Sequence, residues 1–283
     1  MLHRTPGYYN VVRPLRDGVI ADLGMTELMI RHFMEKVLHH RRFVSPRITI
    51  GVPSCITDVE KRAVVECAER AGARQIRVIH ESLAAALGAK LPIYEPEGNM
   101  ICDIGGGTTE ISVLSLGGTV ISNAIRVGGD EFDEAIIRKI RNENNITIKQ
   151  PTAEKIKMTI GTLDLKGKVE TMEIRGRDAL TGLPKRLEIN SKEIASALME
   201  PFNIILDEVK KTLSQTPDEL VSDIIERGIV LAGGGALLKG INVKIAEGTG
   251  VPVIITDDPL RCVADGAGKY FEHEKKLKTL FQH

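Results

Sequence analysis

Three consecutive glycines between two apolar stretches place the tightest constraint on how this chain can fold. Asp103–Glu110 (DIGGGTTE) separates the apolar run Met100–Cys102 from Ile111–Leu114, where apolar residues resume. This pattern predicts two strands joined by a hairpin. Glycine can adopt positive φ and lets backbone N–H groups approach an anion, and the threonines add hydroxyl donors. Asp103, at the end of its strand, is a carboxylate that can hold hydrated Mg²⁺. We therefore expect a phosphate-binding hairpin, with a plain glycine-rich turn as the alternative.

A second glycine cluster follows another apolar strand far downstream. Ile229–Ala232 reads as a buried strand, Gly233-Gly234-Gly235 as a turn, and Ala236–Lys239 as the start of a helix. The first N–H groups of a helix lack internal partners, so such a corner can bind an anion or a ring. One glycine corner is weak evidence, but two of them predict a nucleotide held between elements of one sheet.

The order of elements after residue 98 predicts an α/β domain with a mixed sheet. Three strands form a meander, and helices and strands then alternate, which is the order of a ribonuclease-H-like domain. A capping box, Thr216-Pro217-Asp218-Glu219, opens one of these helices, and Asp130 caps another. Residues 144–193 read as a small insertion that contains a helix at 152–160 and a hairpin with strands at 169–175 and 187–190. The expected strands are 99–103, 109–116, 119–127, 229–232 and 251–256, and the expected helices are 130–140, 191–212, with Pro201 as a kink, and 216–227.

The first ninety residues repeat half of that order without the opening meander. We expect a helix at 25–38, a strand at 47–52, a capped helix at 57–72, a strand at 75–80 and a helix at 81–88. The chain is therefore predicted to be two related lobes, the first of them incomplete. Its divisions are 1–97 for the incomplete first lobe, 98–143 for the hairpin and meander, 144–193 for the insertion, and 194–283 for the second glycine corner and the tail.

Composition excludes some classes of protein. Lysine plus arginine and aspartate plus glutamate both number 38, so the chain lacks the strong basic footprint of a nucleic-acid binder. No apolar run reaches the ~20 residues of a transmembrane helix, and the N-terminus does not resemble a signal peptide. The four cysteines show no C-x-x-C spacing, and we expect reduced core thiols of a cytosolic protein. They are Cys55, Cys67, Cys102 and Cys262.

Stretches along nearly the whole chain resemble the MreB family of bacterial actin homologues, within the actin-like ATPase superfamily. The resemblance implies an actin-like fold with two ribonuclease-H-like lobes. It also implies a protein that binds ATP and Mg²⁺ and hydrolyses ATP as it polymerises. The matching stretches are RTPGYYNVVRPLRDGVIADLGMTELMIRHF, GVPSCITDVEKRAVVECAERAGA, HESLAAALGAKLPI, DIGGGTTEISVLSLGG, RVGGDEFDEAII, TAEKIKMTIG, TGLPKRLEI and IVLAGGGALLKG.

The resemblance assigns roles to individual residues. Glu81 would position the attacking water, and Asp103 would hold Mg²⁺ through water. The phosphates would contact Gly105, Gly106, Gly107 and Thr108; the ribose and base would contact Glu154, Lys155, Ile156 and Lys157; and the adenosine side would be lined by Gly233, Gly234, Gly235, Ala236 and Leu237. Two alternatives stay open. Glu81 could simply stabilise a helix N-terminus, and Glu154 with Lys157 could be a solvated i,i+3 pair. The family usually has proline where this chain has Ser82, and an acid where it has His80.

The resemblance further implies double filaments at the inner face of the cytoplasmic membrane. There they would maintain rod shape by organising cell-wall synthesis with membrane-anchored elongation proteins. Phe43 and Val44 follow two arginines where the family has a loop that contacts lipid, although they could instead pack under that loop. The tail from Tyr270 is expected to form a surface helix that packs on the first lobe.

Other functions compete with this interpretation. The family's first phosphate loop, near its N-terminus, has no counterpart in this sequence, so we expect an N-terminally truncated chain that folds poorly or binds ATP weakly. A non-catalytic remnant or filament modulator is therefore the main alternative. A chaperone-type ATPase also suits DIGGGTTEIS but needs a peptide-binding domain after the ATPase. A sugar or acetate kinase would need larger insertions and a substrate-binding acid.

Overall fold

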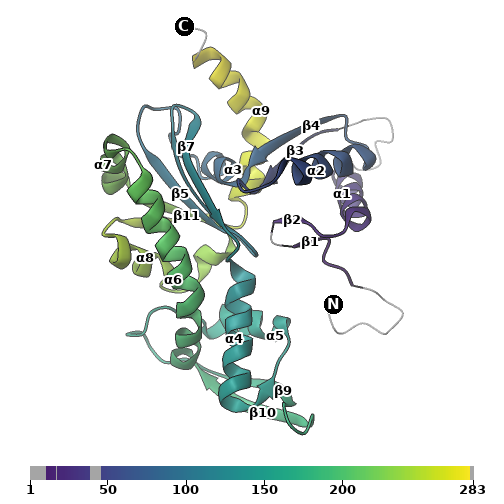
Figure 1. Ribbon diagram of the computed structural model, residues 1–283, viewed down its shortest axis with the longest axis vertical. Helices are drawn as coiled ribbons and strands as arrows, with labels where there is room; N and C mark the ends of the chain where they lie inside the picture. Colours follow the sequence, from purple (N-terminus) through teal and green to yellow (C-terminus); the bar gives the residue numbers. More distant parts are fainter. Residues whose placement is uncertain (1–10, 17, 39–45, 281–283) are drawn as a thin grey trace. The chain divides into compact units, whose positions relative to one another are not determined.

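The computed structural model describes residues 11–16, 18–38 and 46–280, and for 276–280 it describes the backbone alone. In it the glycine hairpin joins the central strand of a five-stranded sheet to the strand beside it. The sheet has the order β12-β11-β5-β6-β7. Figure 1 labels three of these strands, β11, β5 and β7. β5, β6 and β7 pair antiparallel, whereas β11 pairs parallel with both β5 and β12. This confirms the predicted meander and mixed sheet. The strands are β5 (Asn99–Ile104), β6 (Thr109–Ser115), β7 (Gly118–Ile125), β11 (Ile229–Ala232) and β12 (Val253–Ile255).

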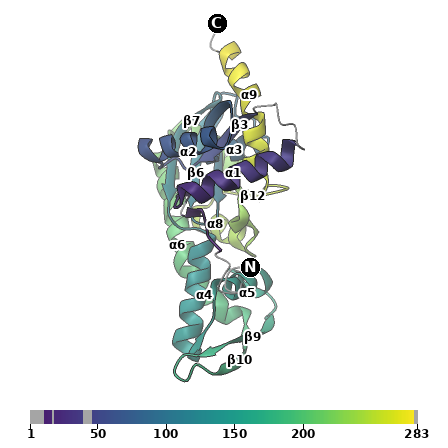
Figure 2. The same cartoon turned by 90° about the vertical axis from the view of Figure 1, so that its right-hand side faces the viewer.

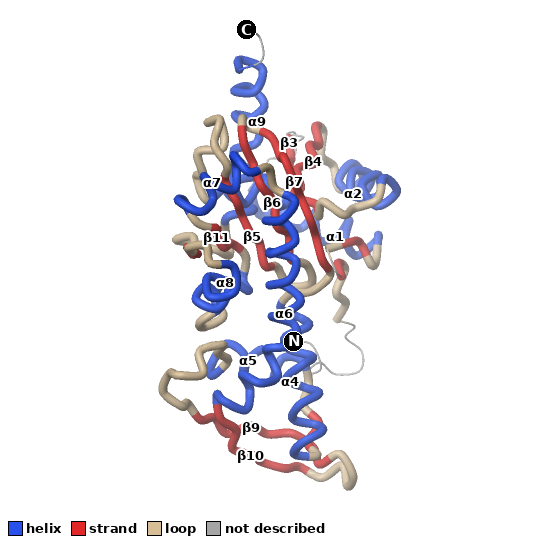
Figure 3. The backbone as a smooth tube through the Cα atoms, turned by 60° about the vertical axis from the view of Figure 1, so that its left-hand side comes forward, coloured by secondary structure: helices blue, strands red, loops and turns tan. Residues whose placement is uncertain are grey.

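The helices around this sheet bury its apolar side chains. All six residues of β5 are buried, which is typical of a central strand covered on both faces. α6 lies over β6 and β7 (Figure 3), and it continues unbroken past Pro201. Asn190 caps this helix and forms a capping box with Glu193. The helices are α4 (Gly129–Asn144), α6 (Ser191–Gln215), α7 (Asp218–Arg227) and α8 (Ile241–Thr249).

The inserted segment forms a small sheet of its own with the order β10-β9-β8. Its hairpin is longer than the sequence predicted, because the register continues without interruption from the pair Thr171–Asn190 to the pair Arg177–Pro184. α5 packs against both α4 and β9 and thereby joins this sheet to the rest of the unit. The elements are β8 (Ile146–Thr147), α5 (Gln150–Ile160), β9 (Thr171–Asp178) and β10 (Pro184–Asn190).

The chain divides into two compact units, Pro92–Arg261 and Met1–Leu91 with Cys262–His283. The second of these is built on the parallel pair β3–β4. Its helix α9 packs closely on α3 (Figure 2), since a Cβ added to Gly266 would lie 1.7 Å from the Ala84 carbonyl oxygen. The tail helix therefore packs on the first lobe, as predicted for the tail from Tyr270, and does not group with the second lobe as in the predicted division 194–283. The elements are β1 (Leu15–Arg16), β2 (Val19–Ile20), α1 (Leu23–Leu38), β3 (Arg47–Val52), α2 (Asp58–Arg70), β4 (Gln75–His80), α3 (Glu81–Gly88) and α9 (Cys262–Leu280).

The helix ends differ in part from those that the sequence predicts. The cap predicted at the start of the helix at 57–72 is confirmed, as a capping box of Thr57 and Glu60. The box predicted at Thr216 is wrong, because the Thr216 hydroxyl donates to the Thr212 carbonyl oxygen and ends α6 instead. Asp130 lies inside α4, whose N-cap is Gly128.

The prediction of a helix at 236–239 is also wrong. A short 3₁₀ turn, η1 (Gly234–Leu237), stands there, and α8 starts only after Gly240, whose φ of +83° lies in the left-handed region.

Candidate functional site

The two glycine corners meet at the carboxyl ends of β5 and β11. Asp103 and Ala232 are register partners in the parallel pairing. Gly233 has φ of +78°, and a Cβ there would lie 2.3 Å from the Ile104 carbonyl oxygen and 2.5 Å from Asp103 Oδ1. A Cβ on Gly235 would lie 2.2 Å from Ile104 Cγ2. Only glycine lets these backbones approach so closely. The predicted juxtaposition of the two clusters on one sheet is confirmed.

The hairpin is fastened to the start of α4 through its carbonyl groups. The Gly105 and Gly106 carbonyl oxygens accept from the N–H groups of Gly129 at 3.0 Å and Asp130 at 2.7 Å. In a trans peptide the N–H points opposite to the carbonyl of the same plane. The N–H groups of Gly106 and Gly107 are therefore directed away from α4. This arrangement of successive amides suits an anion.

Asp103 is a buried carboxylate with an unsatisfied oxygen. Its exposed fraction is 6 %, and Oδ1 has no hydrogen-bond partner among the described residues. Burial, and then the charge of Glu110 opposite it in the sheet, raises the pKa of Asp103 to about 7. An unpaired buried carboxylate is costly, and a cation would relieve that cost.

The carboxylate of Asp103 suits a magnesium ion that is held mainly by water and phosphate. Within the described ranges no group of three or more histidine, cysteine, aspartate or glutamate side chains converges on one point. The described residues therefore offer no set of protein ligands for a structural metal ion. Mg²⁺ commonly binds through one or two carboxylates together with water and substrate phosphates. Asp103 Oδ1, which has no hydrogen-bond partner and lies beside the glycine hairpin, fits this way of binding Mg²⁺.

The four residues predicted to contact ribose and base differ in position. Glu154 and Lys155 are exposed on α5, whereas the side chain of Ile156 is fully buried in the core. Lys157 is 18 % exposed, and its ammonium donates to the Gly129 carbonyl oxygen at 2.6 Å. The same ammonium lies 2.8 Å from Asp133 Oδ1. Lys157 thus contacts α4, the helix whose first turn is hydrogen-bonded to the hairpin.

The predicted adenosine side is formed by η1 and the residue before it. Gly234 and Leu237 are exposed, the latter by 55 %, whereas Ala236 is fully buried. Leu237 therefore offers an apolar surface, and Ala236 contributes packing. Because η1 spans four residues, this corner does not present the N-terminus of an α-helix.

Glu81 lies in the other unit, as the first residue of α3. Its side chain passes over Gly51, where an added Cβ would lie 3.3 Å from Glu81 Cγ. The neighbouring His80 has a lowered pKa, mainly because of burial and then because of the charge of Lys61. The role of Glu81 toward an attacking water remains a prediction. Phe43 and Val44 lie outside the described residues.

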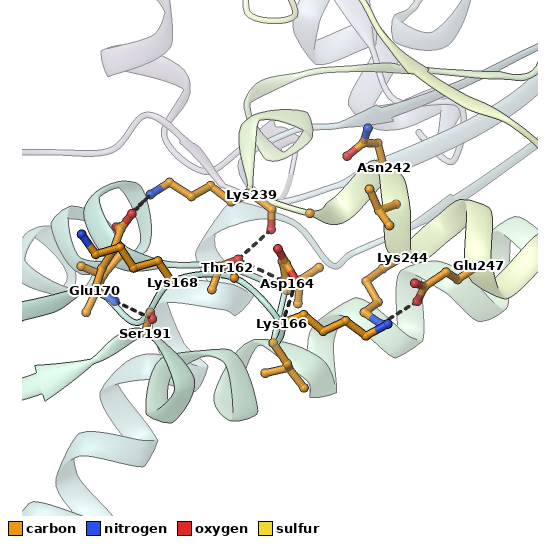
Figure 4. A pocket seen from close by; sticks show the side chains of 16 residues that line it. Thr162, Asp164, Lys166, Lys168, Glu170, Ser191, Lys239, Asn242, Lys244 and Glu247 are labelled. Atoms are coloured by element: carbon orange, nitrogen blue, oxygen red, sulfur yellow. Dashed lines mark hydrogen bonds and ion pairs between the residues drawn. The ribbon is translucent and has the colours of Figure 1, made fainter.

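A cavity of about 690 Å³ lies between the inserted segment and α8 (Figure 4). None of its lining residues belongs to the predicted site. Two ion pairs lie within its lining: Lys239 bonds Glu170 at 2.9 Å, and Lys244 bonds Glu247 at 2.6 Å. We therefore place the candidate site at the glycine corners and not in this cavity.

Sequence reasoning missed Asp133. This acid is buried to 4 % exposure on α4, between the core residues Phe132 and Ile136. A signal was present, since an acid on the apolar face of a helix needs a partner.

The prediction of four core thiols is wrong for Cys55, which is exposed, whereas Cys67, Cys102 and Cys262 are buried and unbridged.

Comparisons with known proteins point to one family. The model of the family described as MreB/Mbl protein matches residues 1–279. The cell shape-determining protein MreB of Escherichia coli K12 is 49 % identical over 274 residues, which cover 96 % of this chain and 79 % of that protein. The cell shape-determining protein Mbl of Bacillus subtilis 168 is 43 % identical over 277 residues, which cover 98 % and 83 %.

Solved structures agree with these relatives. MreB5 of Spiroplasma citri bound to AMPPNP matches with a TM-score of 0.91 and 38 % identity, covering 97 % of this chain and 82 % of that one. The MamK double helical filament matches with a TM-score of 0.76, 22 % identity, and coverage of 92 % and 80 %, which is a likeness of fold alone. Among the helices of the described residues, none has the length and apolar character needed to cross a membrane.

Proposed function

Because this chain belongs to the MreB/Mbl family, we propose that it is an actin-like protein that binds ATP with Mg²⁺ and assembles into filaments that determine cell shape. One observation carries the proposal: the buried, unsatisfied Asp103 Oδ1 lies against Gly233, at the point where the two glycine corners meet. A carboxylate in that position is costly without a cation. A Cβ added to Gly106, in the hairpin, would meet no atom within 4 Å, so the hairpin backbone there is open to a phosphate.

Each part of the site would then have one task. The hairpin residues Gly105–Thr108 would hold the β- and γ-phosphates through backbone N–H groups and the threonine hydroxyl. Asp103 would hold Mg²⁺ through water, and the ion would neutralise phosphate charge. The exposed Leu237, with Gly233–Gly235, would line the adenosine. A relative at 38 % identity, MreB5 of Spiroplasma citri, has structures with AMPPNP and with ADP, which supports a nucleotide at this site.

We also propose that the chain hydrolyses ATP, with Glu81 orienting the attacking water. Glu81 opens a helix and its carboxylate is half-buried, so it can accept a hydrogen bond from water at a fixed place. The proposal rests on the sequence match of HESLAAALG. Replacement by glutamine, Glu81→Gln, is expected to slow phosphate release strongly and to leave ATP affinity within a few-fold. An unchanged hydrolysis rate would exclude Glu81 from this role.

The filaments would be double protofilaments at the inner face of the cytoplasmic membrane, working with membrane-anchored cell-wall elongation proteins. The names of the relatives, cell shape-determining MreB and Mbl, support the cellular role. Phe43 would contribute to lipid contact. Flotation with vesicles that contain anionic lipid tests this point: Phe43→Asp should reduce the bound fraction, and equal binding by both proteins would contradict it.

ATP-dependent sedimentation tests the main proposal. The chain is expected to pellet with Mg-ATP and to stay in the supernatant without nucleotide, with filaments visible by electron microscopy. Asp103→Asn should abolish the ATP-dependent fraction. Asp223→Asn is the matched control, because Asp223 accepts from the Gly98 N–H at 2.7 Å in the same unit and has no place in the nucleotide site. No ATP-dependent pellet from the unaltered chain would favour the non-catalytic alternative.

A further inference from the structure

We infer that the cavity between the inserted segment and α8 is a binding site for a small organic anion that carries an acidic group at each end. Its volume of about 690 Å³ is typical of sites for small molecules. All of its lining residues belong to one compact unit, Pro92–Arg261. None of them belongs to the proposed nucleotide site, so a ligand here would bind in addition to ATP.

The loop that forms one wall of the cavity, residues 161–170, is held by hydrogen bonds at both ends. Near its start the Leu163 N–H donates to the Lys239 carbonyl oxygen at 2.8 Å. At its end the Glu170 N–H donates to the Ser191 hydroxyl at 3.1 Å, and the Ser191 N–H donates to the Glu170 carbonyl oxygen at 2.9 Å. The wall is therefore fixed before any ligand binds.

The lining of the cavity has an excess of positive charge. Lys239 donates to both carboxylate oxygens of Glu170, at 3.1 and 2.9 Å, and Lys244 Nζ lies 2.6 Å from Glu247. A third acid, in the loop, accepts a backbone N–H at 2.9 Å. Four lysines thus face three acids, which leaves a formal charge of +1. The lysines are Lys166, Lys168, Lys239 and Lys244, and the acids are Asp164, Glu170 and Glu247.

Lys166 and Lys168 supply the charge that is free for a ligand. Among the residues that the structure describes, neither ammonium group forms a hydrogen bond or an ion pair. In Figure 4, Lys168 lies toward the Glu170 end of the cavity and Lys166 toward the Glu247 end. The hydrogen bond and the charge of Lys244 lower the pKa of the Glu247 carboxyl, and the charge of Lys166 lowers it further, which agrees with this placement. Each end of the cavity thus presents two lysines and one glutamate.

This distribution of charge defines the class of ligand. Lysine binds phosphate or carboxylate as a point charge, so we expect one acidic group of the ligand at each end. The exposed side chains of Leu165 and Val243 also line the cavity, which suits a carbon skeleton. The first turn of α8, which contains Asn242, has no side-chain cap, and its N–H groups add to the positive potential.

Such a ligand would connect two parts of the unit. Lys166 and Lys168 belong to the inserted segment, whereas Lys244 belongs to α8. A molecule with an acidic group at each end would contact both of them at once. It would thereby hold the inserted segment against the helix.

Calorimetric titration of the full chain with fructose 1,6-bisphosphate, fructose 6-phosphate and fructose tests the inference. The three probes share one skeleton and carry two phosphates, one phosphate and none. The bisphosphate should bind at least about tenfold more tightly than the monophosphate, because the second phosphate gains a charged contact, and fructose should not bind. Equal affinity for the two phosphorylated probes, or no binding of the bisphosphate, would overturn the inference.

Variants of the two free lysines locate the bound probe. Lys166→Ala and Lys168→Ala should each lower the affinity for the bisphosphate by about tenfold, and the double variant should not bind it. Both side chains are exposed and unpaired, so we expect the variants to fold, which circular dichroism checks. Lys210→Ala is the matched control, because Lys210 is an exposed lysine of α6 that does not line the cavity. An equal loss in Lys210→Ala would show an effect of net charge alone and overturn the inference.

Hydrogen–deuterium exchange separates binding in the cavity from binding at the phosphate hairpin. The bisphosphate should slow exchange in peptides covering 161–170 and 239–247, both with and without Mg-AMPPNP. Slower exchange only in 103–109, abolished by Mg-AMPPNP, would place the anion at the hairpin and overturn the inference. If the chain does not bind AMPPNP, the proposed function fails, whereas slower exchange around the cavity would still support this second site.

Discussion

Replacement of Asp103 by asparagine is expected to stabilise the chain in the absence of nucleotide. The pKa of Asp103 rises from 3.8 to about 7, mainly because of burial and then because of Glu110. A shift of about three units corresponds to roughly 4 kcal/mol, at about 1.4 kcal/mol per unit. The carboxyl is 6 % exposed, so solvent screens this cost little. The ionised carboxylate therefore destabilises the unliganded fold, and the cost is absent when Asp103 is protonated.

The sign of the effect is seen most clearly in its pH dependence. Because the folded-state pKa is the higher one, the folded chain binds the extra proton between about pH 4 and pH 7. The contribution of Asp103 to stability falls as the pH rises through that interval and is constant above it. Asparagine has no such titration. An unsatisfied buried amide costs about 1–3 kcal/mol at every pH, so the change with pH is more informative than the absolute difference.

Urea denaturation of both proteins at pH 4.5, 6 and 8, followed by circular dichroism, measures this effect. The free energy of unfolding of Asp103→Asn, relative to the unaltered chain, should increase by about 3–4 kcal/mol from the lowest to the highest pH. A difference between Asp103→Asn and the unaltered chain that does not change with pH would refute the assignment of a destabilising buried charge.

Three further predictions follow from the described contacts. In urea denaturation, Gly233→Ala should lose at least about 2 kcal/mol more stability than Gly250→Ala. Both glycines have positive φ, but of the two only Gly233 has atoms within 4 Å of an added Cβ, and equal losses would contradict this close packing. Thr57→Ala should lower stability by about 1 kcal/mol through loss of a capping box, and no change would refute that role. Iodoacetamide should modify Cys55 in the native chain but Cys102 only after unfolding, because Cys102 is buried and burial raises its pKa. Detection by mass spectrometry of labelled Cys102 from the native chain would contradict this.

The sequence predicts the sheet well because its signals are strong and local. The alternation after the glycines identified β6, and the apolar run 229–232 identified β11. The two glycine clusters were predicted to lie on elements of one sheet, and the structure brings Gly233 against Asp103.

Signals at single residues were less reliable, because the same residue type serves several purposes. Thr216 and Asp130 both resemble caps, but tertiary packing and a better-placed neighbour decide which residue ends a helix. Asp133 was missed because its partner, Lys157, lies on another helix, and only the fold brings them together. The 3₁₀ turn at 234–237 could not be predicted from helix propensity, since its shape depends on contact with Ile104.

The central claim, that adenosine triphosphate occupies the corner formed by the two glycine clusters, is tested most directly by photoaffinity labelling. The chain would be irradiated with 8-azido-ATP and Mg²⁺, digested, and mapped by mass spectrometry. We predict label in peptides covering 229–240 or 150–160, suppressed by excess ATP and absent from Gly233→Ala. Label that ATP does not suppress, or ATP-protected label only in peptides around the 690 Å³ cavity at 164–168 and 242–247, would contradict the account.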